Sequence, residues 1–245
     1  MKIHGTAKGG AISKKDFGVA FGGGASGGVT YSTDFSDDSD WSSPTSGILA
    51  IDTDEERLDF DLTTSSVNAF IHHDMGAGNV SNTEWVLRYE LYWSKIEENS
   101  PSANTNTVCE GLYDQEDPTG QIPTGDALRF CFSPEDAPMN FLEEIDDGSR
   151  TRDIGNGDPF TFDSTGTTYY VEIIRLSATS LQMKAFTGSF DGVQEGTTML
   201  VTTSADVTAL QYITIQLHSG AIGAGDGQIG YIKNLQFWND TTTPT

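Results

Sequence analysis

Short runs of alternating apolar and polar residues recur along most of this chain. Alternate side chains of a β-strand point to the same face of a sheet, so such runs predict half-buried strands. We expect strands at residues 48–51, 57–62, 67–71, 85–93, 128–132, 169–176, 181–186, 199–203, 212–217 and 229–238. No long window keeps the apolar spacing of an amphipathic helix, and the pattern therefore predicts an all-β protein.

Turn-forming residues, chiefly glycine, aspartate, serine and threonine, separate the predicted strands. About a dozen short strands without a fixed-period repeat favour a jelly-roll β-sandwich of two antiparallel sheets. We divide the chain into an extended Gly/Ser/Asp-rich N-terminal arm at 1–40, a sandwich at 41–239 and a polar tail at 240–245.

Charge excludes two classes of partner. The chain has 245 residues, with 13 Lys plus Arg against 36 Asp plus Glu, and a formal net charge of −23. So few cations cannot neutralise a run of phosphates, which argues against nucleic-acid binding. An anionic membrane surface would repel the chain, and no stretch approaches the roughly 18–20 apolar residues that span a bilayer.

The start of the sequence lacks the apolar core of a secretory signal peptide. We therefore expect a protein that is made without that export route and is used on a virion or another extracellular surface.

Several runs resemble known family motifs. They are Trp41 with 47–52, the strand 58–61, the run 84–91 that contains Trp85-Val86-Leu87-Arg88-Tyr89, the run 167–175 and the closing run 230–238. Their order resembles the concanavalin A-like lectin/glucanase superfamily, and within it the laminin-G-like domains, over roughly residues 40–239. The resemblance implies a sandwich in which one curved sheet presents a concave face. These motifs are signatures of the fold rather than of catalysis.

Glycosidases of that superfamily carry paired acids on one strand, where two carboxylates can flank a glycosidic bond. The nearest match here is the run 144–149, in which Gly148 and Ser149 stand where a third acid is needed. The run also lies among turn-forming residues, and 114–117 fails in the same way. We therefore predict that the protein is not an enzyme.

Carbohydrate binding needs aromatic rings that stack on sugars. The candidates are Trp93, Tyr92, Tyr113 and Trp41, of which Trp93 and Tyr92 are expected to be exposed because they lie at a predicted strand end. Trp85 and Trp238 lie in the most apolar strands and are better suited to the core.

Clustered acids suggest a structural calcium ion, although no cofactor is required. The candidate ligands are Asp34, Asp37, Asp38, Asp40, Asp52 and Asp54, because Ca²⁺ prefers oxygen ligands. An EF-hand loop is excluded by Arg57 at the position that requires glycine, and solvated surface acidity is the simpler alternative. Adjacent His72 and His73 would face opposite sides of a strand and cannot chelate together.

The two cysteines, Cys109 and Cys131, lie in apolar, strand-like surroundings on either side of a Gly/Pro-containing segment. Two buried thiols and one disulfide are both compatible with this pattern.

These patterns favour a non-enzymatic structural protein of an assembly, most simply a virion component such as a capsid decoration, fibre or tail protein. In the arm, Phe17, Val19 and Phe21 would share one face of a short strand and dock on a neighbouring copy or on another virion protein. The alternative is a secreted or cell-surface carbohydrate-binding module or adhesin that recognises surface glycans. A degenerate glycoside hydrolase is the third reading.

Overall fold

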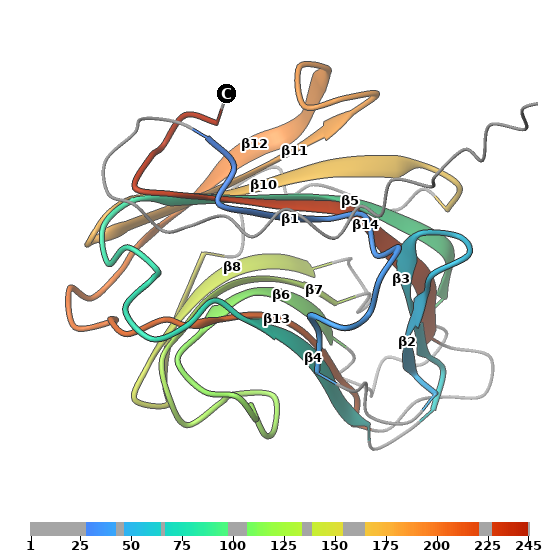
Figure 1. Ribbon diagram of the computed structural model, residues 1–245, viewed down its shortest axis with the longest axis horizontal. Coiled ribbons are helices and arrows are strands. Elements are labelled where there is room, and N and C mark those ends of the chain that lie inside the picture. The colour runs from blue at the N-terminus through green and yellow to red at the C-terminus, as the bar shows by residue number, and fades with distance from the viewer. Residues whose placement is uncertain are drawn as a thin grey trace, which may run out of the picture.

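The computed structural model describes residues 28–42, 47–64, 67–97, 107–133, 139–153, 165–220 and 227–244. Within these ranges the chain forms β-strands and no helix, so it has no helix that could cross a membrane. Two antiparallel sheets pack face to face, which confirms the predicted jelly-roll sandwich (Figure 1). The arm residues Phe17, Val19 and Phe21 lie outside the described ranges.

The larger sheet, sheet A, has eight strands in the order β12-β11-β10-β5-β14-β3-β2, with β1 paired to β14. Its strands are β1 (Tyr31–Thr33), β2 (Leu49–Asp52), β3 (Arg57–Leu62), β5 (Trp85–Glu97), β10 (Thr168–Ser177), β11 (Ser180–Thr187), β12 (Val193–Thr202) and β14 (Gly227–Asn239). The long strands β5 and β14 form its centre, and β1 and β14 bring the first and last strands of the sandwich side by side.

The smaller sheet, sheet B, has six strands in the order β4-β13-β6-β7-β8-β9. Its strands are β4 (Asn68–Asp74), β6 (Thr107–Tyr113), β7 (Ala127–Ser133), β8 (Met139–Asp146), β9 (Ser149–Asp153) and β13 (Tyr212–His218). Sheet B is arched, and its hollow side faces away from sheet A (Figure 1). The sandwich therefore has two outer faces, the hollow face of sheet B and the outer face of sheet A.

The core lies between the sheets and is built from alternate residues of each strand. β5 contributes Leu87, Tyr89, Leu91 and Trp93, all of them fully buried. Burial of each such side chain contributes about 1.5–3 kcal/mol. The hydroxyl of Tyr89 donates a hydrogen bond to Glu110 Oε2 (3.2 Å), and burial raises the pKa of Glu110 to about 8. This carboxyl is therefore largely protonated at neutral pH.

The expectation that the run 144–149 lies among turn-forming residues was wrong for residues 144–146. Residues 139–146 form β8, and its acidic residues alternate between the two faces of sheet B. Glu143 faces the hollow side, where Arg129 of the adjacent strand binds it. Arginines of the neighbouring strands β7 and β9 therefore neutralise Glu143.

Candidate functional site

The centre of the hollow face of sheet B, over β13 and β7, is covered by residues 114–126, the loop that joins β6 to β7, here called the strap (Figure 1). Side chains of the sheet hold the strap by its backbone. Gln216 Nε2 donates to the carbonyl of Gly120 (2.8 Å), and Arg129 Nη2 donates to the carbonyl of Gln121 (2.5 Å). The strap therefore takes up the hydrogen-bonding groups at the centre of this face.

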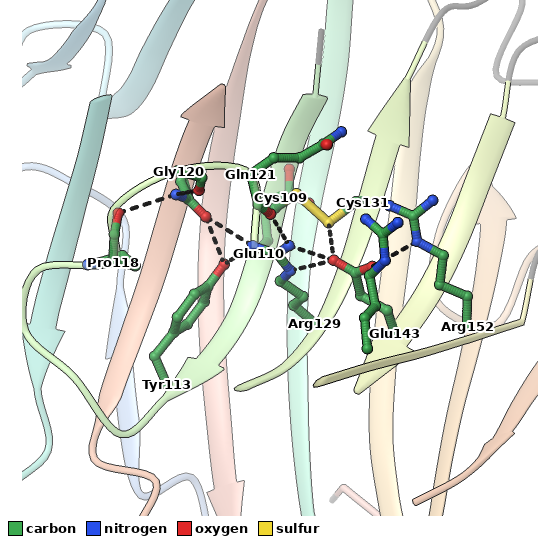
Figure 2. Close-up of a disulfide and its surroundings, with 12 residues drawn as sticks. Cys109, Glu110, Tyr113, Pro118, Gly120, Gln121, Arg129, Cys131, Glu143 and Arg152 are labelled. Atoms are coloured by element: carbon green, nitrogen blue, oxygen red, sulfur yellow. Dashed lines mark hydrogen bonds and ion pairs between the residues drawn. A yellow bond between two sulfur atoms is a disulfide. The ribbon is translucent and has the colours of Figure 1, made fainter. Parts of the chain in front are cut away.

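Arg129 is the centre of the network beneath the strap (Figure 2). Its Nε donates to Glu143 Oε1 (2.6 Å), and its Nη1 donates to Gln216 Oε1 (2.8 Å) and to the hydroxyl of Tyr113 (3.1 Å). Arg129 and Glu143 are both fully buried. Buried charges are stable only when they are paired and hydrogen-bonded, and this pair meets both conditions.

Cys109 and Cys131 lie directly opposite each other on β6 and β7 and form a disulfide on the hollow face (Figure 2). The sequence was compatible with two buried thiols or one disulfide, and the structure has the disulfide. Phe141 of β8 packs against it, and all three side chains are buried. The disulfide thus cross-links two neighbouring strands beside the Arg129 network.

An open groove of about 350 Å³ lies on the outer face of sheet A, where β2, β3, β5 and β14 meet. Tyr92 of β5 and Tyr231 of β14 are cross-strand neighbours in its wall, and their rings stack with centroids 4.7 Å apart. The Arg57 guanidinium of β3 lies 5.0 Å from the centroid of the Tyr231 ring. Three flat groups therefore stand side by side across three strands.

The rim of this groove is polar. Arg57 Nε binds Asp59 Oδ1 at 2.7 Å, and Asp61 and Ser94 add an exposed carboxylate and an exposed hydroxyl. Burial raises the pKa of Asp59, while the Arg57 charge opposes that rise. The groove, here called the tyrosine groove, thus combines an aromatic wall with hydrogen-bond donors and acceptors, an arrangement common in small-molecule sites.

The floor of the tyrosine groove depends on Gly230. A Cβ at this position would lie 2.0 Å from the carbonyl oxygen of Tyr92 and 2.6 Å from the Phe60 ring. Because no side chain fits here, the core residue Phe60 lines the groove from below.

Solved structures of known proteins share this architecture. Arcelin-5, a lectin-like defence protein from Phaseolus vulgaris, has a TM-score of 0.57 and 11% identity, with 84% of this chain and 96% of arcelin-5 covered. The Ca²⁺-bound exoplasmic domain of VIP36 gives a TM-score of 0.57 and 8% identity, with 83% of this chain and 85% of that chain covered. This chain has a concanavalin A-like lectin fold. No protein-family model and no curated protein sequence matches it.

The same lectin fold is present in a viral protein. The CBM2 module of the evolved Dit protein of Lactobacillus casei BL23 phage J-1 has a TM-score of 0.54 and 9% identity. The similarity covers 86% of this chain and 94% of that module. It therefore extends over nearly the whole lectin-like sandwich.

The structure brings together only some of the candidate calcium ligands: Asp34, Asp37 and Asp40 line one hollow on sheet A, whereas Asp38, Asp52 and Asp54 do not. Among the described residues, no group of three or more acidic, histidine or cysteine side chains is placed to hold a metal ion. Three of the candidate aspartates instead bind backbone amides of their own turns: Asp34 accepts from Ser36, Asp37 from Ser39, and Asp52 from Asp54 and Glu55. Aspartate commonly forms such turns, which explains its density here without a metal. Asp38 is exposed, and Asp40 borders an acidic hollow of about 590 Å³ on sheet A.

The four candidate sugar-binding aromatics are dispersed. Trp93 is fully buried because its side chain faces the core between the sheets, where its ring packs against Phe132, and β5 continues past it to Glu97. Tyr113 is buried beneath the strap, and Trp41 is 7% exposed. Tyr92 is half-buried and lies in the tyrosine groove.

Sequence reasoning missed Tyr231 and Arg57 as partners of Tyr92. A signal for their orientation was present, because each occupies an alternate, outward position in a predicted strand. Their proximity depends on β3, β14 and β5 being adjacent in sheet A, although they are far apart in sequence.

Proposed function

We propose that this chain is a non-enzymatic carbohydrate-binding module, and that sugar binds in the tyrosine groove. The observation that carries the proposal is the stacked pair Tyr92 and Tyr231 beside the polar groups of Arg57, Asp59 and Asp61. A sugar ring has apolar C–H faces and a rim of hydroxyls, so it can contact the aromatic wall while its hydroxyls bind the charged rim. The groove volume is near the low end of ligand sites, which span roughly 300–1,000 Å³, and suits one or two sugar units.

The outer face of sheet A is the better location because the strap occupies the hollow face. Arg129, Gln216 and Tyr113 already bind one another and the strap, so a ligand there would have to displace the chain's own contacts. The tyrosine groove is open without any such rearrangement.

The arrangement of acids supports binding rather than hydrolysis. Glu143 and Glu144 project to opposite faces of β8 and cannot act on one bond. Glu143 binds arginines, and Glu144 accepts a hydrogen bond from the backbone amide of Ser204. Both carboxylates therefore have structural partners.

A glycan array with and without Ca²⁺, followed by calorimetry on the best ligand, tests this function. We expect binding by the wild type and at least a tenfold weaker affinity for Tyr231→Ala, because truncation of a central tyrosine in a binding site costs about 2 kcal/mol and a tenfold change corresponds to about 1.4 kcal/mol. The control is Tyr170→Ala, which removes a half-buried tyrosine from the acidic hollow of the same sheet. The proposal fails if no glycan binds in either condition, or if Tyr231→Ala binds like the wild type.

A second candidate is a structural component of a virus particle. The similarity to the phage J-1 module, over 86% of this chain, supports it. In this reading Phe17, Val19 and Phe21 dock the arm on a neighbouring subunit. Deletion of residues 1–27, which spares the Thr30 contacts with β14, should abolish assembly and leave the thermal stability of the sandwich unchanged. Assembly by the truncated chain would contradict it.

A further inference from the structure

Three arginines converge on one carboxylate at the β7–β8–β9 side of the hollow face, and Figure 2 shows two of them, Arg129 and Arg152, beside Glu143. Glu143 is bound by Arg129 through Nε at 2.6 Å and by Arg152 at 2.9 Å, and Arg150 lies 3.9 Å away. Among the described residues, Glu143 is the one carboxylate within ion-pair distance of these three side chains. The group carries three positive charges against one negative charge.

This excess is unusual for the chain, which has 13 Lys plus Arg against 36 Asp plus Glu. Arg129 and Glu143 form a complete buried pair whose remaining donors bind the strap, Tyr113 and Gln216. Arg150 and Arg152 therefore share a carboxylate whose charge Arg129 already neutralises. An additional anion would supply the missing negative charge.

The two excess guanidinium groups are accessible. Arg150 and Arg152 occupy alternate positions of the edge strand β9, so they project from the same face about 7 Å apart along the strand. Their side chains are 26% and 23% exposed. The Arg152 guanidinium also lies 4.0 Å from the centroid of the Phe141 ring, which holds it in place.

Each guanidinium has five N–H donors and can bind an oxyanion through two of them. In the described part of the chain, Arg152 uses its Nε for Glu143, and Arg150 approaches the same carboxylate only at 3.9 Å. Donors therefore remain on both side chains for a ligand.

We propose that Arg150 and Arg152 bind the carboxylate or sulfate group of an acidic polysaccharide, a step that rests on the proposed carbohydrate-binding function. Two cations match one or two acidic groups of a sugar chain, whereas binding of a nucleic acid depends on neutralising a run of phosphates, for which two arginines are too few. The site is separate from the tyrosine groove, because it lies on sheet B and the groove lies on sheet A.

The test compares matched polymers with and without the acidic group. A comparison of dextran sulfate with dextran tests for recognition of a sulfate group. A comparison of polygalacturonate with its methyl ester tests for recognition of a carboxylate group. Binding is measured at 0.15 M salt, where charges more than about 8 Å apart are screened. The variant is Arg150→Gln with Arg152→Gln. The control is Lys184→Gln on sheet A. Lys184 is 29% exposed and lies 3.8 Å from Glu172, which matches the distance of 3.9 Å between Arg150 and Glu143.

We expect the wild type and Lys184→Gln to bind at least one acidic polymer about tenfold more tightly than its neutral counterpart, and the double variant to lose that preference. Equal binding of acidic and neutral polymers, or an unchanged preference in the double variant, would overturn the inference. A double variant that alters only self-association in sedimentation would assign the arginines to a contact between copies and also overturn it. Neutral glycans that still bind in a Tyr231-dependent way would leave the proposed function intact.

Discussion

Glu110 makes the stability of the sandwich depend on pH in a way that one substitution can isolate. Its pKa is about 8 in the folded protein, compared with an ordinary value of 4.5, because burial disfavours the charged carboxylate. Below pH 4.5 both the folded and the unfolded chain hold the proton. Between pH 4.5 and about 8 the folded state keeps a proton that the unfolded state has lost, so the free energy of unfolding falls as pH rises.

The slope is about 1.4 kcal/mol per pH unit, which gives a loss of about 3 kcal/mol between pH 5.5 and 8. Glu110→Gln should abolish this contribution, because the amide resembles the protonated acid and does not ionise. We expect the variant to be about 1.4 kcal/mol more stable than the wild type at pH 5.5 and about 4 kcal/mol more stable at pH 8, so that the difference grows by about 3 kcal/mol.

Urea unfolding followed by tryptophan fluorescence, at half-unit steps from pH 5.5 to 8.5, measures this difference directly. Glu84→Gln removes the same charge from an exposed position and serves as the control. A pH-independent difference between Glu110→Gln and the wild type would refute the assignment of a protonated Glu110.

Three further substitutions test other parts of the structure. Replacing Cys109 and Cys131 with alanine should lower the free energy of unfolding by about 3 kcal/mol in urea titrations, because the bond closes a loop between residues 22 apart in sequence; no loss would contradict this. Gly111→Ala should destabilise the fold by at least about 1–3 kcal/mol, since its Cβ would lie 2.3 Å from a backbone oxygen, whereas Gly28→Ala, with nothing within 4 Å, should be neutral in thermal melts. Arg129→Met should lower the free energy of unfolding by about 3–5 kcal/mol and should speed proteolysis within the strap. An unchanged cleavage rate would argue that Arg129 does not hold the strap on the sheet.

Strand alternation was enough to predict the fold class. β10 illustrates why: Val171 and Ile173 face the core and Tyr170 and Glu172 face outward, as period-two spacing requires. The resemblance to lectin-like domains rested on runs of this kind, and the similarity to solved lectin structures confirmed it.

The parts that could not be predicted depend on neighbours distant in sequence. Residues 144–146 of β8 were expected among turn-forming residues because the strands that pair with them, β7 and β9, are not evident from the local sequence. Trp93 was taken for a strand end because nothing local indicated that β5 continues to Glu97. The tyrosine groove forms because β5, β14 and β3 are neighbours in sheet A, and no local sequence pattern indicates that these strands are neighbours.

A crystal structure of the protein with its tightest-binding neutral glycan tests the central claim most directly. We predict that the sugar lies against Tyr92 and Tyr231 in the tyrosine groove, with hydroxyls bound to Arg57 or Asp59. A sugar bound instead on the hollow face of sheet B, with the strap displaced from Arg129, would contradict the account.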